Sequence, residues 1–68
     1  MSLKKRSFSL SGHRTSVALE AEFWAVIDQS AERDGIALAA LVGKIDATRG
    51  ERPLAGALRL FALAQKAS

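Results

Sequence analysis

The spacing of the apolar residues changes from one period to another within a short stretch of this chain. In the segment 14–19 every second residue, from Thr15 to Leu19, is apolar or β-branched, which is typical of a strand with one buried face. Beyond it, apolar residues recur with the period of about 3.6 that indicates amphipathic helices. The pattern predicts a strand at 14–19, a helix at about 21–34 and a second helix at about 37–49.

Glycines and a proline mark the predicted helix ends. Gly35 and Gly50 stand where a left-handed residue would end the first and second helices. Pro53 suits the first turn of a third helix, which we expect at about 53–66. This helix is apolar over much of its circumference and therefore needs cover on more than one side. The predicted fold class is mainly α with one short strand and a third, C-terminal helix.

The predicted strand needs a partner, because its backbone N–H and C=O groups must be paired or face water. The same strand of a second copy could supply the partner and form an intermolecular two-stranded antiparallel ribbon. Alternatively, residues 7–10, where apolar residues alternate with serines, turn at residues 11–13 and pair within the chain. If they do not, residues 1–13 form a basic N-terminal arm and residues 14–68 form the domain.

The chain has 68 residues, no cysteine and one histidine. It therefore lacks a disulfide, and a single histidine cannot build a metal site, so we expect no cofactor. With 49% hydrophobic residues, association into a homodimer is the expected source of further stability. A reducing, cytoplasmic setting suits the lack of cysteine. No apolar run approaches the roughly 18 residues of a membrane span, so we expect no membrane contact.

The positive charge is unevenly distributed. Residues 1–16 carry a charge of +4 without any acid, whereas the rest of the chain carries −1. A polyanion is the natural partner of such a segment, and a two-stranded ribbon fits the major groove of double-stranded DNA. The alternative is a solvated basic tail without a specific partner.

Several strings of residues together resemble one family. They are Gly12–Val17, Leu19-Glu20, Glu22-Phe23-Trp24, Asp34-Gly35-Ile36, Leu41-Val42 and Ala57–Phe61. They resemble the ribbon-helix-helix family, which includes the Arc and methionine repressors, and more narrowly a bacterial group of short, mostly uncharacterised proteins with this domain. The resemblance covers roughly residues 6–65. It implies a ribbon-helix-helix dimer with an intermolecular ribbon.

The resemblance implies that the outward residues of the strand, Arg14, Ser16 and Ala18, contact base edges. The alternation indicates the same three positions, and an arginine there suits guanine O6 and N7. The start of the second helix would anchor phosphate through backbone amides, since no hydroxyl or amide side chain is present there. The expected phosphate contacts, which include the basic arm, are Lys4, Lys5, Arg6, His13, Ala37 and Leu38. His13 is alternatively a turn residue bonded to local backbone.

The apolar stripes predict the dimer interface, which comprises Thr15, Val17, Leu19, Leu41, Val42, Ile45, Leu58 and Phe61. Trp24 is expected in the core or the interface rather than stacked on a base. Gly43, inside the second helix, is either the close approach of two backbones or a tolerated surface glycine. Arg59 is expected to pair with Asp46 or Glu51, or with an acid across the dimer.

These features predict a dimeric DNA-binding protein, either a transcriptional regulator or an antitoxin-like repressor. The alternative is a dimeric protein–protein interaction module of the same fold that lacks DNA readout, with another protein as partner. The alanine-rich start of the second helix favours this alternative. We do not expect an enzyme, because no acid–base, metal-ligand or phosphate-loop constellation appears in the sequence.

Overall fold

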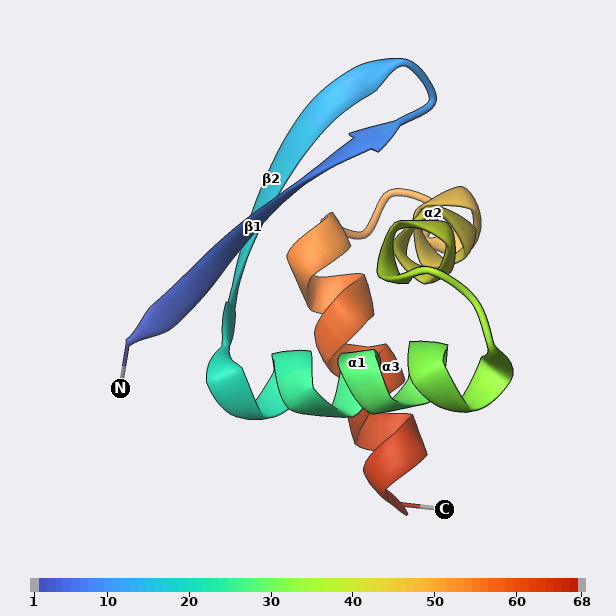
Figure 1. The fold of residues 1–68 in the computed structure, drawn as a ribbon. Coiled ribbons are helices and arrows are strands. Elements are labelled where there is room, and N and C mark those ends of the chain that lie inside the picture. Colours follow the sequence, from blue (N-terminus) through green and yellow to red (C-terminus); the bar gives the residue numbers. More distant parts are fainter. Residues whose placement is uncertain (1, 68) are drawn as a thin grey trace.

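A computed structural model describes residues 2–67, which form a two-stranded hairpin packed against three helices (Figure 1). Met1 and Ser68, at the outer ends of the predicted segments 1–13 and 14–68, lie outside the described residues. The elements are β1 (Leu3–Leu10), β2 (His13–Glu20), α1 (Ala21–Asp34), α2 (Leu38–Thr48) and α3 (Leu54–Ala67). The predicted two-stranded antiparallel ribbon, followed by helices that include a C-terminal one, is confirmed.

The hairpin pairs the two strands along all eight residues of each. Its turn consists of Ser11 and Gly12, whose φ angles are 51° and 80°. A two-residue turn with positive φ at both positions has the twist that antiparallel strands require. Of the two interpretations of the N-terminal segment, the hairpin is the one that the structure contains.

The strand 14–19 has a partner in its own molecule. In this chain β1 supplies the second strand of the ribbon, in the place predicted for a second copy. The physical reason is that β1 has a buried face of its own. Phe8 and Leu10 are each only 8% exposed, so burial of these side chains adds to the backbone hydrogen bonds.

The helix ends follow the predicted signals closely. α1 has the predicted bounds, and Gly35 ends it with a φ of 68°. The amide of Gly35 donates to the carbonyl of Glu32 at 3.1 Å and that of Ile36 to Ala31 at 3.0 Å, which is a Schellman motif. The bounds of α2 and α3 differ from the predicted ones by one residue at each end. Helix ends are defined no more sharply than this.

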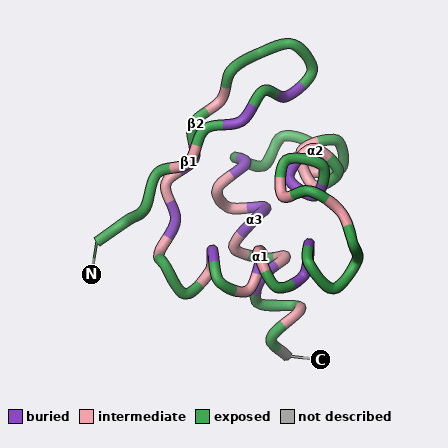
Figure 2. The backbone as a smooth tube through the Cα atoms, in the orientation of Figure 1, coloured by how far each residue is buried: buried purple, intermediate pink, exposed green. Residues whose placement is uncertain are grey.

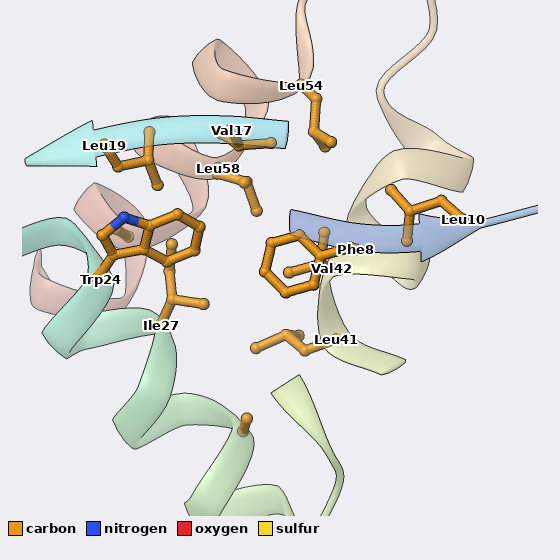
Figure 3. Close-up of a cluster of buried hydrophobic side chains, with 12 residues drawn as sticks. Phe8, Leu10, Val17, Leu19, Trp24, Ile27, Leu41, Val42, Leu54 and Leu58 are labelled. Atoms are coloured by element: carbon orange, nitrogen blue, oxygen red, sulfur yellow. The ribbon is translucent and has the colours of Figure 1, made fainter. Parts of the chain in front are cut away.

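A single hydrophobic core joins the hairpin to the helices (Figures 2 and 3). Trp24, on α1, is 2% exposed and its ring lies 6.0 Å from that of Phe8, measured between centroids. Its prediction as a core residue is confirmed. The other large buried side chains around it include Leu10, Val17, Leu19, Ile27, Leu41, Val42, Leu54 and Leu58.

α3 crosses α1 (Figure 1). One side of α3 is buried against the rest of the chain. Its residues Leu58 and Ala62 are buried, whereas Leu60 and Leu63 are 47% and 51% exposed. The sequence predicted that α3 needs cover on more than one side. The hairpin and the other helices supply the cover for one side, and the side with Leu60 and Leu63 faces outward.

Candidate nucleic-acid interface

The face of the hairpin that points away from the helices is polar. Because side chains alternate along a strand, every second residue of each strand lies on this face, odd-numbered on β1 and even-numbered on β2. At the open end of the hairpin this face carries the exposed Leu3 opposite Glu20. The rest of it comprises Lys5, Ser7, Ser9, Arg14, Ser16 and Ala18, which we call the outer ribbon face. All are exposed except Ala18, which is half-buried. The structure thus brings the three predicted base contacts together on β2 and sets three further residues of β1 beside them.

The pairing register determines which side chains of the outer ribbon face are neighbours. Ser7 lies opposite Ser16, and their hydroxyl oxygens are 2.9 Å apart. One hydroxyl therefore donates to the other, and one O–H of the pair is left to point elsewhere. Lys5 lies opposite Ala18, whereas Arg14 lies opposite Ser9. The two cations thus stand toward opposite ends of the face, with the serine pair between them.

Sequence reasoning did not assign Ser7 and Ser9 to the base-contacting set, and it placed Lys5 among the phosphate contacts. The sequence does contain a signal for a strand here, since serines alternate with Phe8 and Leu10 and a turn-forming Ser-Gly pair follows. That alternation indicates which residues point outward only once the segment is known to be a strand.

Glu20 is the carboxylate-bearing residue on the outward parity of the described strands, and it is paired. Arg59 Nε, on α3, donates to Glu20 Oε1 at 3.1 Å. Hydrogen bonds from the backbone N–H of Glu20 and from Arg59 hold the pKa of this carboxyl below its ordinary value. The carboxylate therefore stays ionised, and the guanidinium compensates its charge.

The structural role predicted for Arg59 is confirmed, but its partner within the described chain is Glu20 and neither Asp46 nor Glu51. Arg59 binds Glu20, whereas Asp46 accepts a hydrogen bond from Arg49 at 2.6 Å. Arg49 stands three residues after Asp46 on the same stretch of chain, so the local pair forms without tertiary packing. Arg59 therefore pairs with Glu20, the acid that the fold brings next to α3.

The basic residues of the arm differ in how free they are. Arg6 Nη1 donates to Asp28 Oδ1 at 2.9 Å, and its guanidinium carbon lies 4.8 Å from the centroid of the Trp24 ring. This side chain is therefore held toward α1. Lys4 and Lys5 are exposed, as is His13 next to the turn. Phosphate contact by these four residues stays a prediction.

The start of α2 carries no side chain that could cap it or bind phosphate. Ala37 is exposed and extended, with φ −67° and ψ 149°, and Leu38 is half-buried. The amides of Ala40 and Leu41 donate back to the carbonyl of Ala37, at 3.0 and 3.1 Å. An anion at this point would have to be held by the amides that precede them.

The residues predicted for the dimer interface lie mostly in the core of the single chain. Five are buried there, namely Val17, Leu19, Leu41, Val42 and Leu58. Thr15, Ile45 and Phe61 are half-buried. The periodicity correctly indicated inward-facing positions, but within this structure the chain's own hairpin and helices cover the five. The exposed Leu60 and Leu63 were not among the predicted interface residues.

Residues 2–67 contain no group of three or more His, Cys, Asp or Glu side chains placed to hold a metal ion, and no pocket. Among the helices so described, none is both long and apolar enough to cross a membrane.

Comparison with known proteins assigns the chain to a family. A family model described as a ribbon-helix-helix domain matches residues 3–66, which include both strands and nearly all of α3. Neither the curated proteins nor the solved structures gave a significant match. The matched region spans almost the whole chain, and the fold has the expected ribbon and helices. The protein is therefore a member of the ribbon-helix-helix domain family.

Proposed function

We propose that this protein is a dimeric DNA-binding protein, acting as a transcriptional regulator or an antitoxin-like repressor in the cytoplasm. The observation that supports the proposal most is the outer ribbon face. It is exposed, it carries Lys5 and Arg14, and the carboxylate of Glu20 at its edge is compensated by Arg59. The major groove, about 12 Å wide, admits a two-stranded ribbon, and its phosphate walls attract such a surface.

Arg14, Ser16 and Ala18 are the proposed base contacts on β2. The guanidinium of Arg14 can donate to O6 and N7 of one guanine, a contact that contributes roughly 1–3 kcal/mol of discrimination. Ser16 can donate or accept and is less selective. Ala18 offers a methyl group, which suits the thymine methyl.

Phosphate contacts would fix the position of the ribbon in the groove. The exposed Lys4, Lys5 and His13 are the proposed side-chain contacts, together with the amides of Ala37 and Leu38 at the start of α2. Arg6 can join them only by leaving Asp28, so we expect it to contribute less.

We place the dimer contact of the intact fold on the exposed side of α3. Leu60 and Leu63 are the large apolar side chains of the described helices that are about half exposed, and the half-buried Phe61 lies beside them. Burial of two such leucines removes apolar surface from water at roughly 25 cal/mol per Å². Of the interface residues predicted from sequence, Thr15, Ile45 and Phe61 keep part of their surface for a second copy.

The test is a fluorescence anisotropy titration of the protein onto a random-sequence DNA duplex at low salt. Non-specific binding of this kind has a Kd of roughly 10⁻⁴–10⁻⁶ M. We expect Arg14→Ala to weaken binding clearly. The matched control is Arg33→Ala, which removes the same charge from an exposed position at the end of α1 and should bind nearly as the wild type does. Absence of binding by the wild-type protein at about 10⁻⁴ M would reject the proposal.

The second candidate is a protein–protein interaction module of the same fold without DNA readout. The exposed apolar side of α3 and the lack of a phosphate-binding side chain at the start of α2 favour it. The two candidates differ in the absorbance ratio at 260 and 280 nm of protein purified without high salt. Copurification of one specific protein and no nucleic acid would favour the module. In neither case do we propose a catalytic function.

A further inference from the structure

We propose that Asp28 and Trp24 hold Arg6 in a closed position on α1, and that a dense phosphate polyanion opens this contact by binding the guanidinium itself. We call these three side chains the Arg6 clasp. The clasp adds an autoinhibitory contact to the proposed function, on which its biological role rests, because duplex DNA is one such polyanion. A cation that could contribute to binding is held on α1 until a ligand competes for it.

The clasp is built from one strand and one helix. Arg6 lies on β1 with the parity of Phe8 and Leu10, so its side chain points to the helices and not to the outer ribbon face. Trp24 and Asp28 lie four residues apart on α1 and therefore on the same side of the helix. Arg6 Nη1 donates to Asp28 Oδ1 at 2.9 Å, and the guanidinium carbon lies 4.8 Å from the centroid of the indole ring. A carboxylate and an aromatic face thus hold one cation together.

The clasp is weak enough to open. The side chains of Arg6 and Asp28 are 38% and 43% exposed, so water and a bound ligand can reach both. Ion pairs with this much exposure contribute little to stability, and salt screens them. One hydrogen bond joins the pair, from Nη1 to one carboxylate oxygen, so Asp28 leaves the other N–H donors of the guanidinium unused. A phosphate group can accept two such donors side by side, which is the stronger geometry.

The neighbours of Arg6 can bring phosphate to the clasp. Lys4 and Lys5 precede it on β1, and both are exposed. In the part of the chain that the structure describes, neither lysine forms a salt bridge. A polyanion bound by the two lysines raises the local concentration of phosphate beside Arg6, whereas a single free phosphate lacks this help. We therefore expect polyanions to open the clasp and orthophosphate to leave it closed.

Tryptophan emission of the free protein tests whether Asp28 holds the cation. The chain has one tryptophan and no tyrosine, so the emission reports this site. We expect Asp28→Asn to change the emission in the same direction as Arg6→Gln, since both take the guanidinium from the ring. The matched control Glu32→Gln removes the same charge from an exposed position one turn further along α1, and should leave the emission unchanged. Emission of Asp28→Asn equal to that of the wild type would overturn the proposal.

Titration with inorganic polyphosphate tests the opening step. This probe carries the phosphate charge without bases, so it tests the clasp apart from base recognition. We expect its binding to shift the wild-type emission toward that of free Arg6→Gln. Orthophosphate at the same phosphate concentration should leave the emission unchanged. A shift with orthophosphate as large as that with polyphosphate would overturn the role of the two lysines.

A double-mutant comparison tests whether Asp28 acts through Arg6. We expect Asp28→Asn to bind polyphosphate up to about fivefold more tightly than the wild type, because the competing carboxylate is gone. In the Arg6→Gln background the same substitution should change the affinity less. An equal fold-change in both backgrounds would show that Asp28 acts only by repelling the ligand, and would overturn the clasp. Circular dichroism checks that each variant is folded.

The outcomes separate the clasp from the proposed function. If the wild type binds polyphosphate with the expected change of emission and binds no duplex, the clasp stands and the proposed function fails. If it binds duplex, but polyphosphate either does not bind or leaves the emission unchanged, the clasp is overturned and the proposed function stands.

Discussion

The indole Nε1 of Trp24 donates a hydrogen bond to the backbone carbonyl of Lys4 at 2.7 Å, across 20 residues of sequence. This bond fastens the first strand to the first helix. The ring of Phe8 packs against the indole at a tilt, and the guanidinium of Arg6 lies over the face of the indole. One core side chain therefore holds the strand, the helix and a basic residue of the arm together.

Replacing this indole should loosen the hairpin. We expect Trp24→Phe to lower the free energy of unfolding by about 1–3 kcal/mol, because the side chain loses volume in a packed core and the hydrogen bond disappears. Urea unfolding followed by circular dichroism measures the change. Phe23→Leu, at a half-buried neighbouring position, is the control and should have a smaller effect. An unchanged urea midpoint for Trp24→Phe would contradict this account of the core.

The two turn residues should respond to substitution in opposite directions. Ser11 holds a φ of 51° and Gly12 a φ of 80°, a region that asparagine and glycine occupy more readily than other residues. We expect Ser11→Asn to stabilise the protein and Gly12→Ala to destabilise it by about 1–2 kcal/mol. A Cβ at Gly12 would meet no atom within 4 Å, so any loss reflects backbone strain alone. Thermal unfolding measures both changes, and destabilisation by Ser11→Asn would argue against this turn geometry.

The pair of Glu20 and Arg59 should make stability depend on pH in the acid range. The pKa of Glu20 is lowered in the folded chain by hydrogen bonds from its own backbone N–H and from Arg59. Its contribution is therefore fully present above the pKa of the unfolded chain and is lost as pH falls through the folded-state pKa.

Urea midpoints measured from neutral pH to well below about 4.3, the ordinary glutamate value, test this dependence. We expect the wild type to be more stable than Glu20→Gln at neutral pH, and the difference to vanish in acid. The exposed Glu51 provides the control, because Glu51→Gln should not reproduce that effect. A constant difference across the whole range would contradict the pairing.

Gly43 should tolerate a side chain. A Cβ there would lie 4.0 Å from Leu10 Cδ2, which is ordinary van der Waals contact. We expect Gly43→Ala to stabilise α2 by about 1 kcal/mol, since glycine is unfavourable inside a helix. Gly35→Ala is the contrasting control, because the φ of 68° at that position strains any other residue. Should Gly43→Ala instead weaken the dimer in sedimentation, the interpretation of Gly43 as a site where two helices approach closely would be supported.

Local patterns were enough to predict the parts of this fold that depend on local physics. The change of apolar period located the strand and the helices, because side-chain direction repeats every two residues in one and about every 3.6 in the other. Gly35 indicated the end of α1, since a left-handed position disfavours residues with a Cβ. The parity of Arg14, Ser16 and Ala18 followed in the same way, and the structure places all three on one face.

The partners of these elements required three-dimensional packing. Unpaired N–H and C=O groups along a strand edge demand a neighbour without specifying which one, so β1 and a second copy were equally able to satisfy them. Arg59 likewise had several acids within reach in sequence terms, and it binds one that stands 39 residues away. An apolar stripe shows that a surface needs cover, but it does not show what covers it. On α3 the rest of the chain buries Leu58 and leaves Leu60 about half exposed. The periodicity of apolar residues indicates a strand or a helix from the local sequence alone. Which element or side chain then packs against it depends on how the whole chain folds.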